Sequence, residues 1–172
     1  GGERRLLTAG IQNLDKDRVP ARIAARGGLG ALMGSRRLKA IVIDDSGGEK
    51  PPVADMAAFR AAQKEYNKAL MEHPQTKVYT DYGTIAVGRL CQTFGALPVR
   101  NFSAGQLMDL EPVSAEHMRT LLLERDGEAD TSHACMRGCT IRSSNVYAGP
   151  DGKSIVSPLE YETVGLMGMN LG

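Results

Sequence analysis

Two cysteines four residues apart are the clearest candidates for chemistry in this 172-residue chain. They lie in the segment Cys135-Met-Arg-Gly-Cys139, which would place both thiols on one face if it were helical. Thiolates are soft ligands suited to zinc or to an iron–sulfur cluster. His133 could add a third ligand, although His-x-Cys-x3-Cys is not a common zinc spacing. Cys91 lies in an apolar run and is expected to be a buried structural thiol. The pair therefore predicts either a metal site or two unligated thiols in a loop.

A glycine-rich run beside basic residues is the second candidate site. Residues 24–39 read AARGGLGALMGSRRLK. Backbone N–H groups beside the basic side chains of this run can bind an anion such as phosphate, because the glycines allow close approach and left-handed geometry. The glycine spacing is one residue longer than the dinucleotide fingerprint, and residues 20–25 do not resemble a strand. The run indicates either a site for a phosphate-bearing cofactor or a tight packing turn between a helix and the strand that follows.

Two glutamates follow the cysteine segment. Ser157-Pro158-Leu159-Glu160 is typical of a helix start, with proline at the first helical position and glutamate at the third. In that arrangement Glu160 would close a capping box with Ser157. Glu162 lies two positions further on, on a different face of the helix, and no cap explains it.

The elements that would position these groups change in kind along the chain. The N-terminal part predicts short strands with a glycine-rich connection, then a Gly/Pro linker at 46–52, and the remainder predicts mainly helices. The expected strands are 6–12 and 38–44, with a helix opened by Pro20 between them and turned by the glycines from residue 27. The expected helices run from Asp55 to about Glu72, ended by His73-Pro74, over 84–94, and from a cap at Ser114, while 126–152 is expected to be a loop.

Composition bounds the class of protein. Hydrophobic residues make up 42% and charged residues 24%, which is typical of a globular chain. A net charge of +1 argues against a broad nucleic-acid or membrane surface, and no apolar run reaches the ~20 residues of a membrane span. Three cysteines are too few for a disulfide scaffold and indicate a reducing, cytoplasmic compartment. The first residues, GGERR, and the apolar pattern at the other end lead us to expect a piece of a longer chain.

Several motifs, in the same order, resemble one enzyme family. The run ARGGLGALMGSRRLKAIVI is similar to the G-R-G-G-L-G-A-V-M-G-S-K-x-L-K-A-I signature of the aldehyde ferredoxin oxidoreductase family. Tyr82-Gly-Thr resembles its YGT motif, residues 95–102 (GALPVRNF) resemble GALPTRNF, and residues 158–165 (PLEYETVG) resemble (P/L)-E-Y-E-T-(I/V)-G. The resemblance covers nearly the whole chain.

The resemblance implies an α+β fold and a redox function. Residues 1–48 would be the C-terminal part of a β-rich base domain, and residues 49–172 the first part of a mainly helical domain. The cofactors would be a tungsten or molybdenum bis-pterin, Mg²⁺ bridging the pterin phosphates, and a 4Fe-4S cluster. The intact enzyme would oxidise a small aldehyde, or reduce a related carbonyl or acid, and pass electrons to ferredoxin or an electron-transfer subunit, with a homodimer as an assembly to test.

Site roles follow from the same resemblance. Arg26, Gly27 and Gly28 would bind the pterin phosphates, and Cys135 and Cys139 would bind the cluster. Many family members have a further cysteine where this chain has Ser143, so either the cluster is bound unusually or it is lost. The family places an active-site glutamate in the segment that holds Glu160 and Glu162, and both are candidates, with Glu162 preferred because no cap occupies it.

Two functions from other classes remain open at this point. One is a non-catalytic binding or assembly domain that kept the scaffold and lost the cluster, which Ser143 favours. The other is a small zinc module built from His133, Cys135 and Cys139.

Overall fold

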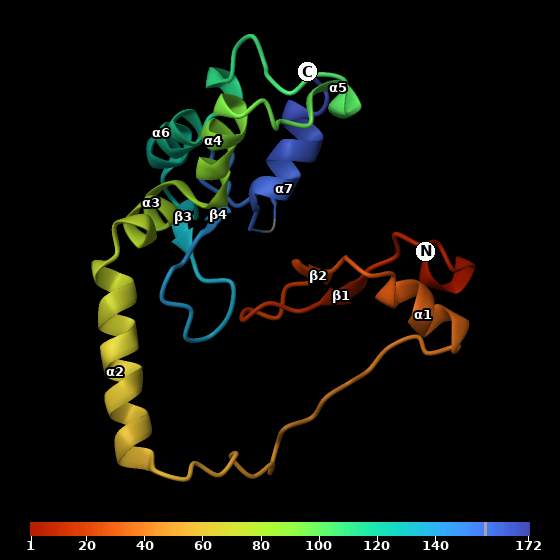
Figure 1. Ribbon diagram of the computed structural model, residues 1–172, viewed down its shortest axis with the longest axis vertical. Coiled ribbons are helices and arrows are strands. Elements are labelled where there is room, and N and C mark those ends of the chain that lie inside the picture. Colours follow the sequence, from red (N-terminus) through yellow and green to blue (C-terminus); the bar gives the residue numbers. More distant parts are fainter. Residues whose placement is uncertain (157) are drawn as a thin grey trace. The chain divides into compact units, whose positions relative to one another are not determined.

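The chain folds into two compact units, Gly1–Gln63 and Lys64–Gly172 (Figure 1). A computed structural model describes residues 1–156 and 158–172. Helices predominate, and the described residues form two small antiparallel sheets of two strands each. The α+β class is therefore confirmed, with the mainly helical part in the second unit.

The first unit consists of a hairpin and one short helix. Its elements are the 3₁₀ turn η1 (Gly2–Arg4), the strands β1 (Ile11–Asn13) and β2 (Arg22–Ala24), and the helix α1 (Leu29–Ser35). The hairpin pairs Ile11 with Ala24, and its loop is closed by the Asp15 carboxylate, which accepts the N–H groups of Asp17 (2.8 Å) and Val19 (2.9 Å). The helix expected after Pro20 is thus wrong, because that segment pairs as β2 instead. The strand expected at 6–12 forms only at its end, in β1.

Residues 38–44 do not form the strand that their β-branched composition predicts. Ile41, Val42 and Ile43 are 68%, 91% and 85% exposed. A strand needs a neighbour to accept and donate its backbone hydrogen bonds, and within residues 1–156 and 158–172 none pairs with this segment. The composition therefore predicted a strand, but no described segment provides the neighbouring strand that it needs.

The glycine-rich run packs helix α1 closely against the start of the chain. The Gly30 N–H donates to the Ala9 carbonyl oxygen at 3.0 Å, and a Cβ at Gly30 would lie 2.5 Å from that oxygen. A Cβ at Gly34 would overlap the Gly2 carbonyl group. The close-packing interpretation of the run is confirmed at these positions, although the partner is η1 and the preceding turn, not a following strand.

Helix α2 (Met56–Glu72) matches the predicted span, and the boundary between the two units falls within it. The Asp55 carboxylate accepts the Ala58 N–H at 2.9 Å, which is the expected N-terminal cap. Its large apolar side chains are mostly exposed, however, with Phe59 at 52% and Tyr66 at 66%.

The second unit has its own hydrophobic core. Its elements are α3 (Pro74–Tyr82), η2 (Thr84–Ala86), α4 (Val87–Thr93), α5 (Val99–Phe102), η3 (Glu111–Val113), α6 (Ala115–Arg125), β3 (Asp130–His133), β4 (Ser144–Val146), α7 (Tyr161–Val164) and the π-helical η4 (Gly165–Met169). Its core residues are mainly aliphatic, with one tyrosine: Ile85, Leu97, Val99, Ala115, Leu122, Tyr147, Val164 and Met169.

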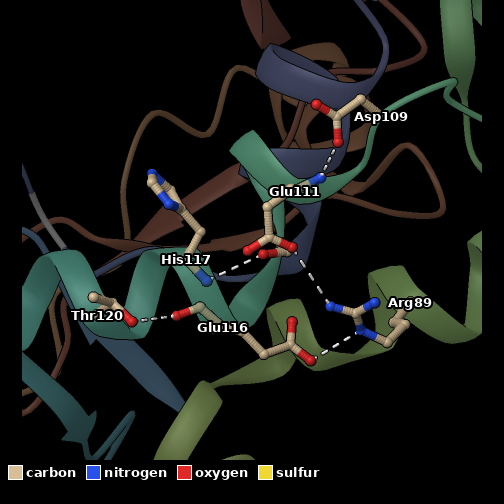
Figure 2. Close-up of polar contacts among 7 residues, drawn as sticks. Arg89, Asp109, Glu111, Glu116, His117 and Thr120 are labelled. Atoms are coloured by element: carbon tan, nitrogen blue, oxygen red, sulfur yellow. Dashed lines mark hydrogen bonds and ion pairs between the residues drawn. The ribbon is translucent and has the colours of Figure 1, made fainter.

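Polar contacts hold three of these elements together at the surface (Figure 2). Ser114 caps α6 as predicted, and its hydroxyl accepts the His117 N–H at 3.1 Å. Arg89 on α4 donates to the Glu116 carboxylate at 2.9 Å and lies 3.8 Å from the Glu111 carboxylate. Arg89 therefore joins α4 to both η3 and α6.

The segment expected to be a loop at 126–152 contains a sheet. Strands β3 and β4 pair antiparallel, with Asp130 opposite Val146 and His133 opposite Ser144. The chain between the two strands is irregular, and it carries the paired cysteines. This sheet is what holds both ends of the cysteine segment.

Candidate functional site

The two thiols of the cysteine pair lie within hydrogen-bonding reach of each other, although their segment is not helical. It forms a turn in which the Cys139 N–H donates to the Met136 carbonyl oxygen at 3.2 Å, and Gly138 has a left-handed φ of 80°. Both cysteines are half-buried and neither is in a disulfide. The turn between β3 and β4 thus brings the two thiols close together, which their spacing in the sequence had only suggested.

Backbone donors surround the sulfur of Cys139. Partial burial alone would raise the pKa of this thiol, but N–H groups of Arg142, Cys135 and Ile141 and the Cys135 thiol point to the sulfur and outweigh it. The Arg142 N–H lies 3.4 Å from the sulfur. The pKa of Cys139 is therefore below the ordinary thiol value. This environment favours a thiolate, which is the form that binds metals.

Ser143 and His133 border the turn at the start of β4 and the end of β3. Ser143 is half-buried, and its carbonyl oxygen accepts the Thr84 N–H at 3.1 Å. Among residues 1–156 and 158–172, no cluster of three potential metal ligands combines His133 with the two cysteines. The geometry therefore supports a two-thiol element without His133.

Cys91 lies apart from this turn, on α4. It is half-buried and packs against the core, in keeping with the structural role expected for it. Its side chain also contacts Tyr161 on α7. Burial, with Cys91 as the next cause, raises the pKa of Tyr161 to about 12.

Helix α7 begins later than the sequence pattern predicts. Its first helical residue is Tyr161, and Glu160 is the extended residue that precedes it, with φ −121° and ψ 172°. Leu159 exchanges two backbone hydrogen bonds with Asn145 of β4, at 3.1 and 2.8 Å, which keeps the chain extended up to that point. Placing Pro158 first and Glu160 third in a helix is therefore wrong. The other half of the expected capping box, Ser157, lies outside the described residues.

Two hydroxyl groups donate to the carboxylate of Glu160. Thr84 Oγ1 donates to Oε2 at 2.8 Å, and Ser144 Oγ donates to Oε1 at 2.5 Å. Thr84 Oγ1 also accepts the backbone N–H of Tyr161 at 2.7 Å. Sequence reasoning missed Thr84 and Ser144, although Thr84 ends the Tyr82-Gly-Thr motif that could have drawn attention to it.

Glu162 has a different environment from Glu160. It lies in the first turn of α7 and is exposed. Within the part of the chain that the structure describes, its carboxylate has no hydrogen bond or ion pair. The two candidate glutamates are only two positions apart, but they differ in their hydrogen bonds: within the described part of the chain, the Glu160 carboxylate accepts two, and the Glu162 carboxylate accepts none.

The turn at Arg26, Gly27 and Gly28 is exposed at its first two residues and half-buried at Gly28. Gly27 and Gly28 both adopt left-handed φ angles, 80° and 68°. Among the described residues, no acceptor binds their N–H groups and no carboxylate pairs with the Arg26 guanidinium. Unsatisfied donors beside a cation suit an anionic ligand such as phosphate.

Two family models match this chain in consecutive segments. "Aldehyde ferredoxin oxidoreductase, N-terminal domain" matches residues 1–45, and "Aldehyde ferredoxin oxidoreductase, domains 2 & 3" matches residues 61–172. The chain belongs to the aldehyde ferredoxin oxidoreductase family. The resemblance seen in its motifs is therefore confirmed.

Curated relatives of this aldehyde ferredoxin oxidoreductase family member are much longer. A tungsten-containing aldehyde ferredoxin oxidoreductase of Pyrococcus furiosus is 34% identical over 152 residues, and one of Thermococcus kodakarensis is 31% identical over 156. Each alignment covers 88% of this chain and 24% of the relative. An aliphatic sulfonate oxidoreductase, WOR-like subunit, of P. furiosus is 29% identical, over 100% of this chain and 26% of its own length. The chain thus spans about a quarter of the relatives' length.

The N–H groups and thiols of this family member are chemically suited to the cofactors that its motifs imply. Free N–H groups beside Arg26 match a phosphate-bearing pterin, and a thiol pair with N–H···S bonds at Cys139 matches a soft metal centre. Among the described residues, no helix is both long enough and apolar enough to cross a bilayer.

Proposed function

We propose that this chain is part of a tungsten- or molybdenum-pterin oxidoreductase that oxidises a small aldehyde, or reduces a related carbonyl or acid. The observation that carries the proposal is the turn between β3 and β4, where two thiols lie together and backbone N–H groups favour the thiolate of Cys139. Membership of a family whose curated relatives are named tungsten-containing aldehyde ferredoxin oxidoreductases supports it.

The first unit contributes to pterin binding in this proposal. The Arg26 guanidinium and the N–H groups of Gly27 and Gly28 would hold the phosphates of a pterin, and Mg²⁺ would neutralise part of their charge. The bound pterin metal centre supplies the two-electron redox chemistry. The protein orients that group. The boundary between the β-rich base domain and the helical domain is proposed to fall near residue 48, within the Gly/Pro linker at 46–52, and so before the boundary between the two compact units.

The second unit contributes to electron transfer. Cys135 and Cys139 provide two ligands of a 4Fe-4S cluster, and ligands beyond these two come from elsewhere in the enzyme or from Ser143. Electrons leave to ferredoxin or to an electron-transfer subunit. Three cysteines, too few for a disulfide scaffold, support a reducing, cytoplasmic location. A homodimer stays a prediction that solution measurements can test.

Glu162 serves as the active-site carboxylate in this proposal. It is exposed in the first turn of α7 and unpaired among the described residues, so it is free to take a proton from an attacking water.

Elemental analysis of the intact, anaerobically purified protein tests the function, together with aldehyde-dependent viologen reduction. Tungsten or molybdenum together with iron, and viologen reduction, is the expected result. Absence of all metals would instead favour an assembly domain, and zinc alone a zinc module built on the thiol pair. The isolated 172-residue chain is expected to show no activity, because it spans only a quarter of its relatives. Activity of the isolated chain would contradict that expectation.

A further inference from the structure

We propose that Glu160 is a positioning residue which, with Thr84 and Ser144, fixes the start of helix α7 and so directs Glu162 toward the reacting atoms. The inference rests on the proposed function and assigns different tasks to the two candidate glutamates. It also gives a role to the Tyr82-Gly-Thr motif, which takes no part in the proposed pterin and cluster sites.

Both oxygens of the Glu160 carboxylate are already engaged. Thr84 donates to one oxygen at 2.8 Å and Ser144 to the other at 2.5 Å. Ser144 is fully buried, so its hydroxyl has no bulk water with which to replace this bond. A carboxylate that accepts two hydroxyl bonds in a half-buried place is held in one orientation. Turning this carboxylate toward a substrate water would break these bonds.

Thr84 connects the carboxylate to the helix itself. Its hydroxyl donates to Glu160 and accepts the N–H of Tyr161, the first residue of α7, at 2.7 Å. N–H groups in the first turn of a helix have no partner within the helix and need one from outside. In α7 this partner comes from η2 and not from the residues just before the helix. Thr84 therefore acts as a distant cap for α7.

Backbone bonds hold the three contributing segments in register. The Thr84 N–H donates to the Ser143 carbonyl oxygen at 3.1 Å, which ties η2 to the start of β4. Asn145 and Leu159 exchange bonds at 3.1 and 2.8 Å, which ties β4 to the chain entering α7. The Thr84, Ser144 and Glu160 side chains thus meet on a backbone framework that leaves little freedom in their spacing.

This framework determines where Glu162 points. Glu162 lies in the first turn of α7, directly after Tyr161, whose N–H is bound by Thr84, so the direction of its side chain depends on the geometry of that turn. Glu160 is held inward by its two hydroxyl donors, and Glu162 is exposed. Loosening the first turn of α7 would change the direction of the Glu162 carboxylate without touching it. Such a shift lowers turnover, because catalytic groups must stay within a narrow range of positions.

The test compares four variants in the intact enzyme, with tungsten or molybdenum and iron content measured for each. Glu162→Gln is expected to lower kcat at least 100-fold at unchanged metal content, as loss of a general base does. Glu160→Gln, which keeps hydrogen-bonding atoms in the same place, is expected to lower kcat less than ten-fold and to retain the acidic limb of the pH–rate profile. Thr84→Val removes the hydroxyl at nearly constant volume and is expected to lower kcat at least ten-fold, while Thr84→Ser restores it.

Hydrogen exchange gives a readout that does not depend on turnover. In Thr84→Val, peptides covering residues 159–165 are expected to exchange at least ten-fold faster than in the wild type, and Thr84→Ser is expected to restore protection. Unchanged exchange in Thr84→Val would overturn the distant cap. Loss of at least 100-fold in kcat together with loss of the acidic limb in Glu160→Gln would show that Glu160 is itself the base and would also overturn the proposal. If the wild type carries no pterin metal and reduces no viologen, the proposed function fails, and exchange at α7 alone then decides whether Thr84 caps the helix.

Discussion

Replacing Gly83 with alanine is expected to loosen the contact between the Tyr82-Gly-Thr turn and β4. Gly83 has φ 68° and ψ −175°, a conformation essentially restricted to glycine, and imposing it on alanine costs about 1–3 kcal/mol. A Cβ would also overlap Asn145 Oδ1 and lie 3.0 Å from the Ser143 carbonyl oxygen. Overpacking of this kind adds about 1–3 kcal/mol. We expect a total of about 3 kcal/mol, which is on the order of 10²-fold in the equilibrium for local opening.

Asn145 has little freedom to relieve this overlap. It is 2% exposed, and its Nδ2 donates to the Thr131 carbonyl oxygen at 3.3 Å. Hydrogen exchange of β4 peptides in the intact protein measures the effect. Gly95→Ala is the matched control, because Gly95 also has a left-handed φ of 64° but a Cβ there meets no atom within 4 Å. Its cost should be backbone strain alone, about 1–2 kcal/mol, and should not reach β4.

A double variant separates strain from overlap at Gly83. Asn145→Ala removes the overlapped oxygen, so Gly83→Ala should cost less in that background, by roughly the steric share. Equal costs in both backgrounds, or a Gly83→Ala variant that is no worse than Gly95→Ala in β4, would refute the argument from close approach.

Further predictions concern the surface ion pairs, the pterin site and the cluster. Arg89→Met should cost at most about 1 kcal/mol at neutral pH, since Arg89 and Glu116 are 56% and 47% exposed, and hydrogen exchange in α6 measures it. The Arg89 hydrogen bond lowers the pKa of Glu116 below 4.5, so this contribution is present above that pH and disappears as the pH falls through the folded value; a difference that persisted at pH 2 would contradict it. Arg26→Ala in the intact enzyme should weaken pterin affinity by roughly one to two decades, the equivalent of ~1.5–3 kcal/mol for a charge-assisted bond. Wild-type pterin content at limiting cofactor would show that Arg26 is not a phosphate ligand. Ser143→Cys should raise iron retention on dilution without changing the fold, while an unaltered paramagnetic resonance signal in Ser143→Ala would exclude Ser143 as a ligand.

Features fixed by near neighbours were predictable from the sequence. Helix α2 starts after Asp55 and α6 after Ser114, because each cap is made by a side chain three residues before the N–H that it accepts. The family signature was also legible in the sequence, since it consists of residue types in order. The left-handed turn at Gly27 and Gly28 followed from glycine's freedom at positive φ.

Features that depend on distant partners were decided by the tertiary structure. Residues 38–44 have strand composition but no pairing partner among the described residues, whereas residues 22–24 and 144–146 pair as strands that composition did not predict. Glu160 has the sequence context of a local cap, yet its carboxylate is bound by Thr84, 76 positions away along the chain. Spacing in a sequence reports contacts over one or two helical turns. Strand pairing and hydroxyl contacts across the fold carry no such period, so only the folded chain determines which glutamate is held and which is free.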